Sequence, residues 1–274
     1  MAAAAYGVVV AASLHTGCSD TPIDPPDADA GPDRVGYTDP DAFVWPADAG
    51  PRLTPHDGVT LPNVQLGVIY VGDLDAGGMP GNDAILKWLL GSPYWGLLNE
   101  YGIGAGSVVG SVRVATSSLL GPGDVDANSK LVELLVLDAR VAALLHGADG
   151  GAPAVSIPGA EAYLLYLPDG VNVALGHRGS YTYQTCVDAY GFHAFDGLEP
   201  YAILPPCEEG RSLYAAAHEL SEMATDPEPY HGWVSDVDLA TNGGEVADLC
   251  SEKVMQEGVV VTRLWSNAQS RCVP

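Results

Sequence analysis

A short run of imidazole and carboxylate side chains is the part of this sequence best suited to chemistry. It reads His218-Glu219-Leu220-Ser221-Glu222. The run follows the pattern H-E-x-x-H, in which two His residues on one helix bind zinc and the Glu acts as a general base, but its last position is Glu. Positions i and i+4 share a helix face, so His218 and Glu222 could bind one ion with Glu219 beside them. We therefore expect a metal site with Glu219 as its catalytic base.

A third ligand has to come from elsewhere in the chain, because catalytic zinc takes three protein ligands and structural zinc takes four. Glu245 is our first choice. Asp248 follows it and would orient a ligating His without touching the ion, an arrangement similar to that of thermolysin-like peptidases. The sequence therefore predicts His218, Glu222 and Glu245 as the ligand set.

Other residues could supply the third ligand instead. Metzincin-like enzymes take it shortly after the helix, which would favour Asp226 or Glu228. His231 and His193 are less favoured alternatives. These choices stay open at the level of sequence.

The Glu at the last position of the motif also changes the chemistry expected of the ion. A set of His218, Glu222 and Glu245 carries two negative charges, which neutralise a divalent ion and make it a poorer Lewis acid. Carboxylate-rich ligation suits harder ions than a His-rich set does. Zinc is the expected ion, calcium and manganese are the alternatives, and a metal site without proteolysis is compatible with this sequence.

The charge of the chain limits its partners. Its 274 residues include 35 Asp and Glu against 11 Lys and Arg, a formal net charge of −24. Such a surface repels phosphate backbones, which excludes nucleic acid as a partner. The 47% hydrophobic content is enough for a substantial core. We expect a monomer that acts on a peptide or a cell-surface polymer.

The N-terminal region has the features of an exported lipoprotein. Residues 1–17 contain an apolar stretch too short to span a bilayer, which is typical of a signal peptide. Thr16-Gly17-Cys18 is similar to a bacterial lipobox, in which Cys18 would be lipidated and anchor the protein to a membrane. Residues 18–61 are rich in Asp and Pro and predict a disordered tether. We expect an outer-membrane or cell-surface lipoprotein, or otherwise an extracellular protein.

Four cysteines follow Cys18, and an even number in an exported chain predicts two disulfides. Four cysteines allow three pairings, of which we choose the one between sequence neighbours, Cys186–Cys207 and Cys250–Cys272. A cysteine-ligated metal is the alternative, but the chain has no CxxC spacing.

Hydrophobic patterns after residue 61 alternate between strand and helix. They predict strands at 64–71, 108–115, 161–167, 201–204 and 259–265, and helices at 82–101 (broken near Pro93) and 128–146. Residues 176–197 have an irregular pattern. Ser212 is placed to cap the motif helix, which Pro227 ends. We therefore expect residues 62–274 to form a single layered α/β domain, zincin-like, with a mixed sheet and a metal-motif helix.

Several blocks of residues resemble the phosphate-induced, Exordium-like family and its bacterial secreted relatives. In order they cover most of residues 64–274, and they are Ser92-Pro93-Tyr94-Trp95, Gly191-Phe192-His193, Tyr201-Ala202-Ile203-Leu204-Pro205-Pro206-Cys207, Ala217-His218-Glu219-Leu220-Ser221-Glu222, Thr225-Asp226-Pro227, Gly244-Glu245-Val246-Ala247-Asp248-Leu249-Cys250 and Leu264-Trp265-Ser266-Asn267. The resemblance implies an exported protein associated with the cell wall or surface. It implies no defined reaction.

Two functions are therefore compatible with the sequence. In the first, the protein is an exported metallopeptidase-like hydrolase, in which Glu219 deprotonates the water that attacks a carbonyl polarised by the ion. In the second, it is a non-catalytic surface module of the Exordium-like family with a structural or vestigial metal site. The first is our leading expectation.

Overall fold

The computed structural model describes residues 51–73, 78–148, 152–178, 181–235, 244–250 and 252–274. The predicted signal peptide, Cys18 and the tether up to residue 50 lie outside the described residues. The remaining end of the predicted tether is part of the fold, so the boundary at residue 61 is wrong. Leu53 is buried in the core, and β1 (Thr54–Pro55) pairs with β10 (Trp233–Val234).

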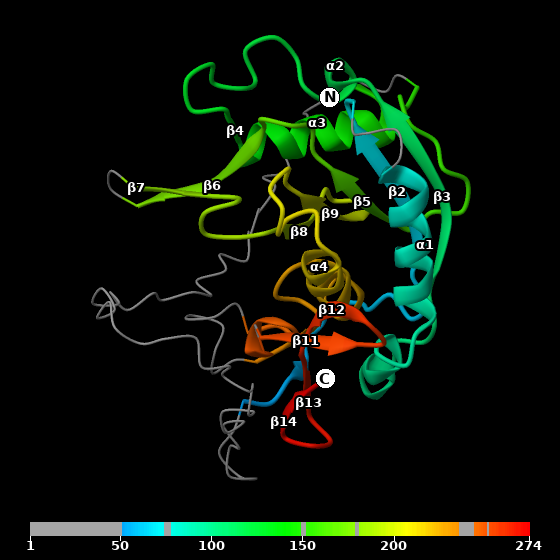
Figure 1. Ribbon diagram of the computed structural model, residues 1–274. Helices are drawn as coiled ribbons and strands as arrows, with labels where there is room; N and C mark the ends of the chain where they lie inside the picture. Colours follow the sequence, from blue (N-terminus) through cyan, green and yellow to red (C-terminus); the bar gives the residue numbers. More distant parts are fainter. Residues whose placement is uncertain (1–50, 74–77, 149–151, 179–180, 236–243, 251) are drawn as a thin grey trace, which may run out of the picture.

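A five-stranded sheet forms the centre of the protein (Figure 1). Its order is β3-β2-β5-β9-β8, and the strands are β2 (Gln65–Val71), β3 (Ser107–Val114), β5 (Ala162–Tyr166), β8 (Phe192–Phe195) and β9 (Pro200–Leu204). Four of these strands run parallel, and the edge strand β8 is antiparallel to β9. Strands β2, β5 and β9 are almost wholly buried, as expected for parallel strands covered on both faces.

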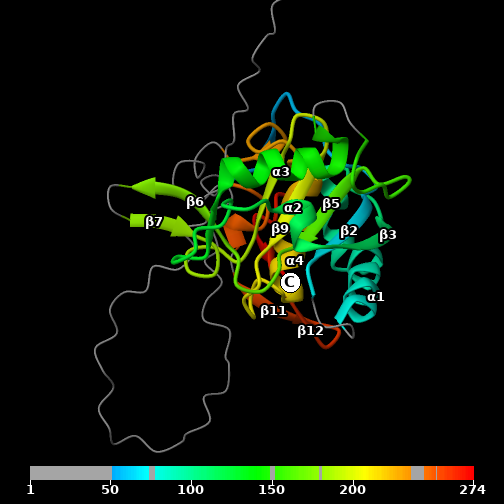
Figure 2. The same cartoon turned by 90° about the horizontal axis from the view of Figure 1, so that it is seen from above.

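Each face of the sheet has its own hydrophobic core. Helix α3 (Leu134–His146) covers one face, together with the short α2 (Thr116–Leu119). It lies above the sheet in Figure 1 and in front of it in Figure 2. Helix α1 (Gly78–Gly91), η1 (Trp95–Tyr101) and α4 (Leu213–Thr225) pack on the other face. Because strand side chains alternate between faces, β2, β5 and β9 each contribute residues to both cores.

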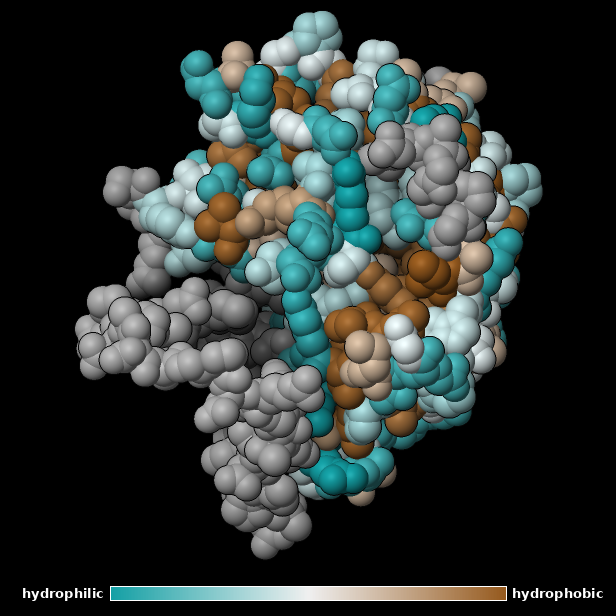
Figure 3. Space-filling view, in the orientation of Figure 1, coloured by the Kyte–Doolittle hydropathy of each residue, from teal (hydrophilic) through white to brown (hydrophobic). Residues whose placement is uncertain are grey.

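Smaller β elements surround this centre. A second sheet consists of β4 (Leu131–Glu133), β6 (Asn172–Arg178) and β7 (Tyr181–Gln184). After η3 (Asp248–Cys250) come two antiparallel pairs, β11 (Lys253–Gln256) with β12 (Val259–Thr262) and β13 (Leu264–Ser266) with β14 (Arg271–Val273). The β11–β12 pair covers the outer side of α4 (Figure 1). It exposes Met255 and Val260. The face of the protein in Figure 3 shows apolar areas between hydrophilic side chains.

The protein is therefore a mixed α/β fold with several sheets and few helices, and the described strands form no closed barrel. Two predictions of local structure were wrong. Residues 131–133 form a strand rather than part of the predicted 128–146 helix. Lys130 has a positive φ of 62°, which a right-handed helix does not allow, and Val132 packs in the core on the α3 side of the sheet. The segment 176–197, predicted to be irregular, contains β7, β8 and the end of β6, since pairing with neighbours outweighs its weak local pattern.

Both predicted disulfides are present. Cys186 pairs with Cys207, and Cys250 pairs with Cys272, with Cα–Cα distances of 5.8 and 5.6 Å. Disulfides are consistent with an exported protein. No helix in the described part of the chain is long and apolar enough to cross a bilayer.

Asp138 of α3 is a buried carboxylate that joins a helix to the sheet. The hydroxyl of Tyr201 on β9 donates a hydrogen bond to it. Burial raises the pKa of Asp138 to about 6 from an ordinary 3.8; the Tyr201 bond opposes this rise, and the charge of Asp196 adds to it. The folded state therefore binds this proton more tightly than the unfolded state does.

We predict that Asp138 makes the protein less stable as pH rises from about 4 to 7. Ionising it in the fold costs about 3 kcal/mol at 1.36 kcal/mol per pKa unit, so the free energy of unfolding should fall across this range. Asp138→Asn should not show that part of the fall, because the amide keeps an acceptor for Tyr201 and carries no charge. Urea unfolding of both proteins at several pH values measures the difference. Parallel pH profiles would contradict the prediction.

Candidate functional site

The motif helix α4 lies in the interior of the protein. Every residue from Tyr214 to Thr225 is buried, between the central sheet and the β11–β12 pair. Ser212 caps the helix by accepting a hydrogen bond from the N–H of Ala215, and the helix ends at Asp226, before Pro227. These are the ends that the sequence predicted. Alanines at 215, 216, 217 and 224 let the neighbouring strands approach closely, so the polar motif side chains are enclosed by protein.

The order of the motif side chains around the helix places Glu222 between the other two. At about 100° per residue, Glu222 lies roughly 40° from His218, and Glu219 lies roughly 100° from His218 on the same side. All three are at most 4% exposed. The carboxylate of Glu222 can therefore contact groups on both sides of it.

On one side, Glu222 meets His218 and Asp248. The Nε2 atom of His218 lies 3.1 Å from Oε1 of Glu222 and 3.2 Å from Oδ1 of Asp248. The backbone N–H of Asp248 donates a 3.0 Å hydrogen bond to the same Glu222 oxygen. One donor atom from each of these three side chains lies within 4.8 Å of the others, so the group could hold a metal ion.

On the other side, Glu222 meets His193 and Glu219. The Nδ1 atom of His193 lies 3.7 Å from Oε2 of Glu222 and 3.8 Å from Oε2 of Glu219. These three side chains also have donor atoms within 4.8 Å of one another and could hold an ion. His193 Nδ1 and Glu219 Oε2 have no hydrogen-bond partner among the described residues. Glu222 thus belongs to two groups of possible ligands.

The pleat of β8 explains why His193 points at α4. Phe192 and Ala194 face the core on the α3 side of the sheet, so His193 between them faces the opposite side, where α4 lies. Gly191 just before the strand leaves room for Glu219. A Cβ atom on Gly191 would lie 2.8 Å from Cγ and Oε1 of Glu219.

Glu245 contacts His193. Its Oε1 lies 3.2 Å from Nε2 of His193, and the carbonyl oxygen of Asp226 lies 3.1 Å from the same nitrogen. Two acceptors at Nε2 favour the tautomer or cation that carries a proton there. In the neutral ring this leaves the lone pair on Nδ1, directed at Glu219 and Glu222.

The positions of Glu245 and Asp248 therefore favour the reverse of their predicted roles as third ligand and as orienting residue. Asp248 is the one beside His218 and Glu222, where a third ligand would be, and Glu245 is the one that orients a His. The reason lies in the turn of η3, which directs the Asp248 side chain to His218. Spacing along the sequence did not show this, because the prediction followed the thermolysin-like arrangement, in which the Glu is the ligand and the following Asp orients a His.

The alternative ligands that follow the helix are not in either group. Asp226 is buried, but its carboxylate accepts hydrogen bonds from the backbone N–H groups of Tyr230, His231 and Gly232, and thereby folds the loop after α4. Glu228 is exposed and lies 3.9 Å from His231, which is also half exposed.

The site contains more acidic groups than basic ones, and this raises the proton affinity of its members. Burial alone lowers the pKa of His218, but the charges of Glu222 and Glu219 and hydrogen bonds with Asp248 and Glu222 outweigh it and raise that pKa well above its ordinary value. The pKa of His193 is raised in the same way, against burial, mainly by Glu245. Burial, followed by the charge of Asp248, raises the pKa of Glu222 to about 8. The cluster therefore needs positive charge, from protons or from a cation.

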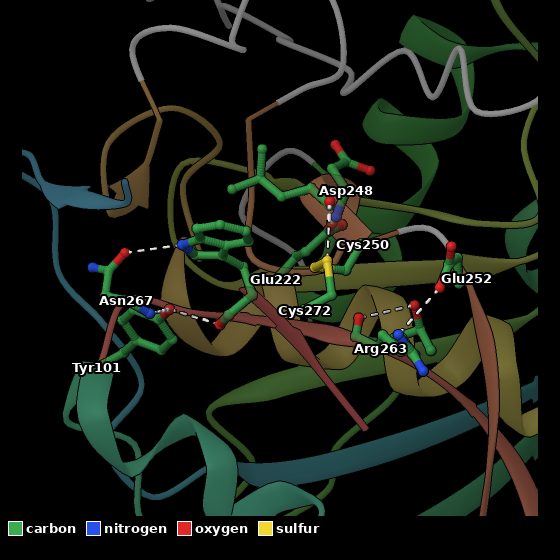
Figure 4. Close-up of a disulfide and its surroundings, with 11 residues drawn as sticks. Tyr101, Glu222, Asp248, Cys250, Glu252, Arg263, Asn267 and Cys272 are labelled. Atoms are coloured by element: carbon green, nitrogen blue, oxygen red, sulfur yellow. Dashed lines mark hydrogen bonds and ion pairs between the residues drawn. A yellow bond between two sulfur atoms is a disulfide. The ribbon is translucent and has the colours of Figure 1, made fainter. Parts of the chain in front are cut away.

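A disulfide fixes the segment that carries Asp248. Cys250 ends η3 and pairs with Cys272 on β14, while the N–H of Trp265 on β13 donates to the carbonyl of Val246 (Figure 4). Val246 and Ala247 are fully buried. The C-terminal strands thus hold Glu245 and Asp248 on opposite sides of the cluster.

Comparisons of the chain with known protein families, with curated proteins and with solved structures gave no match. The site is therefore interpreted from its own geometry. That geometry brings together His218, Glu219 and Glu222 as the motif predicted, with Asp248 and Glu245 close by. The sequence made His193 a less favoured choice of ligand. The only local signal for its orientation was the alternation of apolar residues around it on β8.

We predict that Asp248→Asn weakens metal binding more than Glu245→Gln does. Each change removes one charge and preserves shape, but only Asp248 lies beside His218 and Glu222. Losing a ligand should lower affinity more than 100-fold, whereas losing a residue that orients a ligand typically costs about 10–100-fold. Competition with a chelator of known affinity gives both constants. A larger effect of Glu245→Gln would restore the ligand set predicted from the sequence.

We also predict that the two disulfides differ in their effect on the site. They close loops of 21 and 22 residues, so replacing either pair by Ser should destabilise the fold by a similar amount, about 3 kcal/mol. Only loss of Cys250–Cys272 should also weaken metal binding markedly, because that bridge holds η3. Denaturant unfolding and metal titration of the two double variants test this. Equal metal affinities would show that η3 is held without its disulfide.

Proposed function

We propose that this protein is an exported metal-dependent hydrolase, peptidase-like in its chemistry, with its centre at the cluster around Glu222. The observation that carries the proposal is the arrangement of His218, Glu222 and Asp248, whose donor atoms lie within 4.8 Å of one another. One imidazole and two carboxylates are a ligand set that suits zinc or manganese. Calcium fits less well, because it takes oxygen ligands and the group includes a nitrogen.

Glu219 is the residue proposed to act as the general base. It lies one position after His218 on α4, is 2% exposed, and has a carboxylate oxygen without a hydrogen-bond partner among the described residues. A bound ion would polarise a carbonyl group and make a nearby water more acidic. Glu219 would take the proton of the attacking water and pass it to the leaving group.

As parts of the same proposal, the domain is zincin-like, the protein has a lipid anchor, and the chain is related to the Exordium-like family. A motif helix packed on a mainly parallel sheet supports the first, and two disulfides support export. Peptides and cell-surface polymers remain the proposed substrate classes.

A second candidate function is a non-catalytic surface module with a structural metal. Its support is the burial of the cluster, since His193, Glu222 and Glu245 are 0% exposed. Structural sites are enclosed by protein, whereas catalytic sites keep a position open to substrate. Under this alternative, removing the metal with a chelator would lower the melting temperature of the protein, which would hydrolyse no peptide with or without metal.

We predict that Glu219→Gln lowers the rate of peptide hydrolysis by at least 100-fold, because general bases typically contribute 10²–10⁴-fold. The His218 group should keep its ion, since Glu219 is not part of it. Cleavage of a peptide library by protein loaded with one equivalent of metal gives the rate, and elemental analysis gives the metal content. Glu161→Gln, an exposed acid at the start of β5, is the matched control and should behave as the unchanged protein does.

The outcomes separate the two candidates. Metal without hydrolysis in the unchanged protein would support the structural module and reject the hydrolase. A protein with neither metal nor hydrolysis would reject both.

A further inference from the structure

His193 occupies a position that a single metal site does not explain. It lies on β8, is 0% exposed, and is on the side of Glu222 away from Asp248. Its Nδ1 atom faces two carboxylate oxygens at 3.7 and 3.8 Å. These separations are too long for hydrogen bonds.

The same separations fit donor atoms arranged around a cation. With bonds of about 2.1 Å, tetrahedral ligands lie about 3.4 Å apart, so small side-chain shifts would bring all three donors onto one ion. The contacts of Nε2 with Glu245 and with the carbonyl of Asp226 keep the Nδ1 lone pair directed at this point. A backbone carbonyl or carboxylate beside one ring nitrogen is the usual support of a metal-ligating His, and here the carbonyl of Asp226 accepts the hydrogen bond.

Charge gives an independent argument. Glu219, Glu222, Asp248 and Glu245 together carry up to four negative charges in the interior of the protein. One divalent ion beside His218 would compensate two of these charges and leave the other two to protons or to a second cation, because buried unpaired charges are strongly unfavourable. Two divalent ions with neutral imidazoles would balance all four.

We propose that a second divalent ion binds at His193, Glu219 and Glu222, so that Glu222 bridges two ions with one oxygen on each. The inference rests on the proposed metal site at His218, Glu222 and Asp248 and extends it to a carboxylate-bridged pair. The ligands on each side are one imidazole and two carboxylates, which suits manganese or zinc. Glu219 can serve as a general base only while the second position is empty.

The test uses manganese, because two Mn²⁺ ions bridged by a carboxylate have an exchange-coupled electron paramagnetic resonance spectrum. The purified protein is loaded with Mn²⁺ and dialysed at high ionic strength, which removes ions held weakly by its acidic surface. We expect two Mn²⁺ per chain and a coupled spectrum. Carboxylate-bridged ions lie about 4 Å apart, whereas ions on the surface would give uncoupled signals.

Two variants address the second position. In His193→Gln, the amide N–H can still donate to the carbonyl of Asp226, but the side chain has no metal-binding atom at the place of Nδ1. Gly191→Ala instead pushes on the Glu219 side chain, and Gly91→Ala is its control because a Cβ there meets nothing within 4 Å. We expect one uncoupled Mn²⁺ in each of the first two variants and a coupled pair in the control. Gly191→Ala keeps the test decisive if His193→Gln does not fold.

The results distinguish this inference from the proposed function. One Mn²⁺ per chain that His193→Gln does not affect would overturn the second position and leave the first site standing. If His193→Gln still binds two Mn²⁺ ions that show no exchange coupling, the second position would also be overturned. A protein without tightly bound metal would contradict the proposed function and this inference together.

Discussion

The burial of the Glu222 carboxylate is the constraint on which the rest of the site depends. A carboxylate removed from water requires hydrogen bonds and positive charge from its surroundings. Glu222 obtains them from three parts of the chain: His218 one turn earlier on α4, the backbone of Asp248 on η3, and His193 on β8. Each of these elements is in turn fixed by packing or by a covalent bond, so the position of Glu222 and the tertiary fold determine one another.

The layers of the fold make this burial feasible. Helix α4 lies between the central sheet and the β11–β12 pair, and its alanines give the strands on both sides close access to its backbone. The edge strand β8 runs antiparallel to its neighbour and presents His193 to the helix. The C-terminal strands and the Cys250–Cys272 bridge close the remaining side. Functional groups from distant parts of the sequence therefore converge on Glu222.

The Glu at the last position of the motif has a consequence that a His would not have. A carboxylate has two oxygens that accept independently, whereas a neutral imidazole has one lone pair for an ion or a donor. Glu222 uses this property, with Oε1 directed at His218 and Oε2 at His193. A His at position 222 could contact only one of these two partners through a lone pair. The substitution that makes the motif unusual is thus the feature that links the two halves of the cluster.

The sequence by itself determined the elements with strong local signals. Ser212 and Pro227 set the ends of the motif helix, and continuous apolar runs marked β2, β5 and β9. The even number of cysteines predicted two disulfides, whose pairing was chosen among three possibilities. Helical spacing alone placed His218, Glu219 and Glu222 on one side of α4. These features depend on residues close together in the chain, where periodicity and capping act directly.

Only the tertiary structure decided which residues complete the site and what each one contacts. The strands β4, β7 and β8 have weak local patterns and form because neighbouring strands pair with them. The orientation of His193 depends on which face of β8 meets α4, and the exchanged positions of Glu245 and Asp248 depend on the turn of η3. Because these contacts join residues that are 26 or more positions apart, such as Glu222 and Asp248, no pattern within a short window contains them.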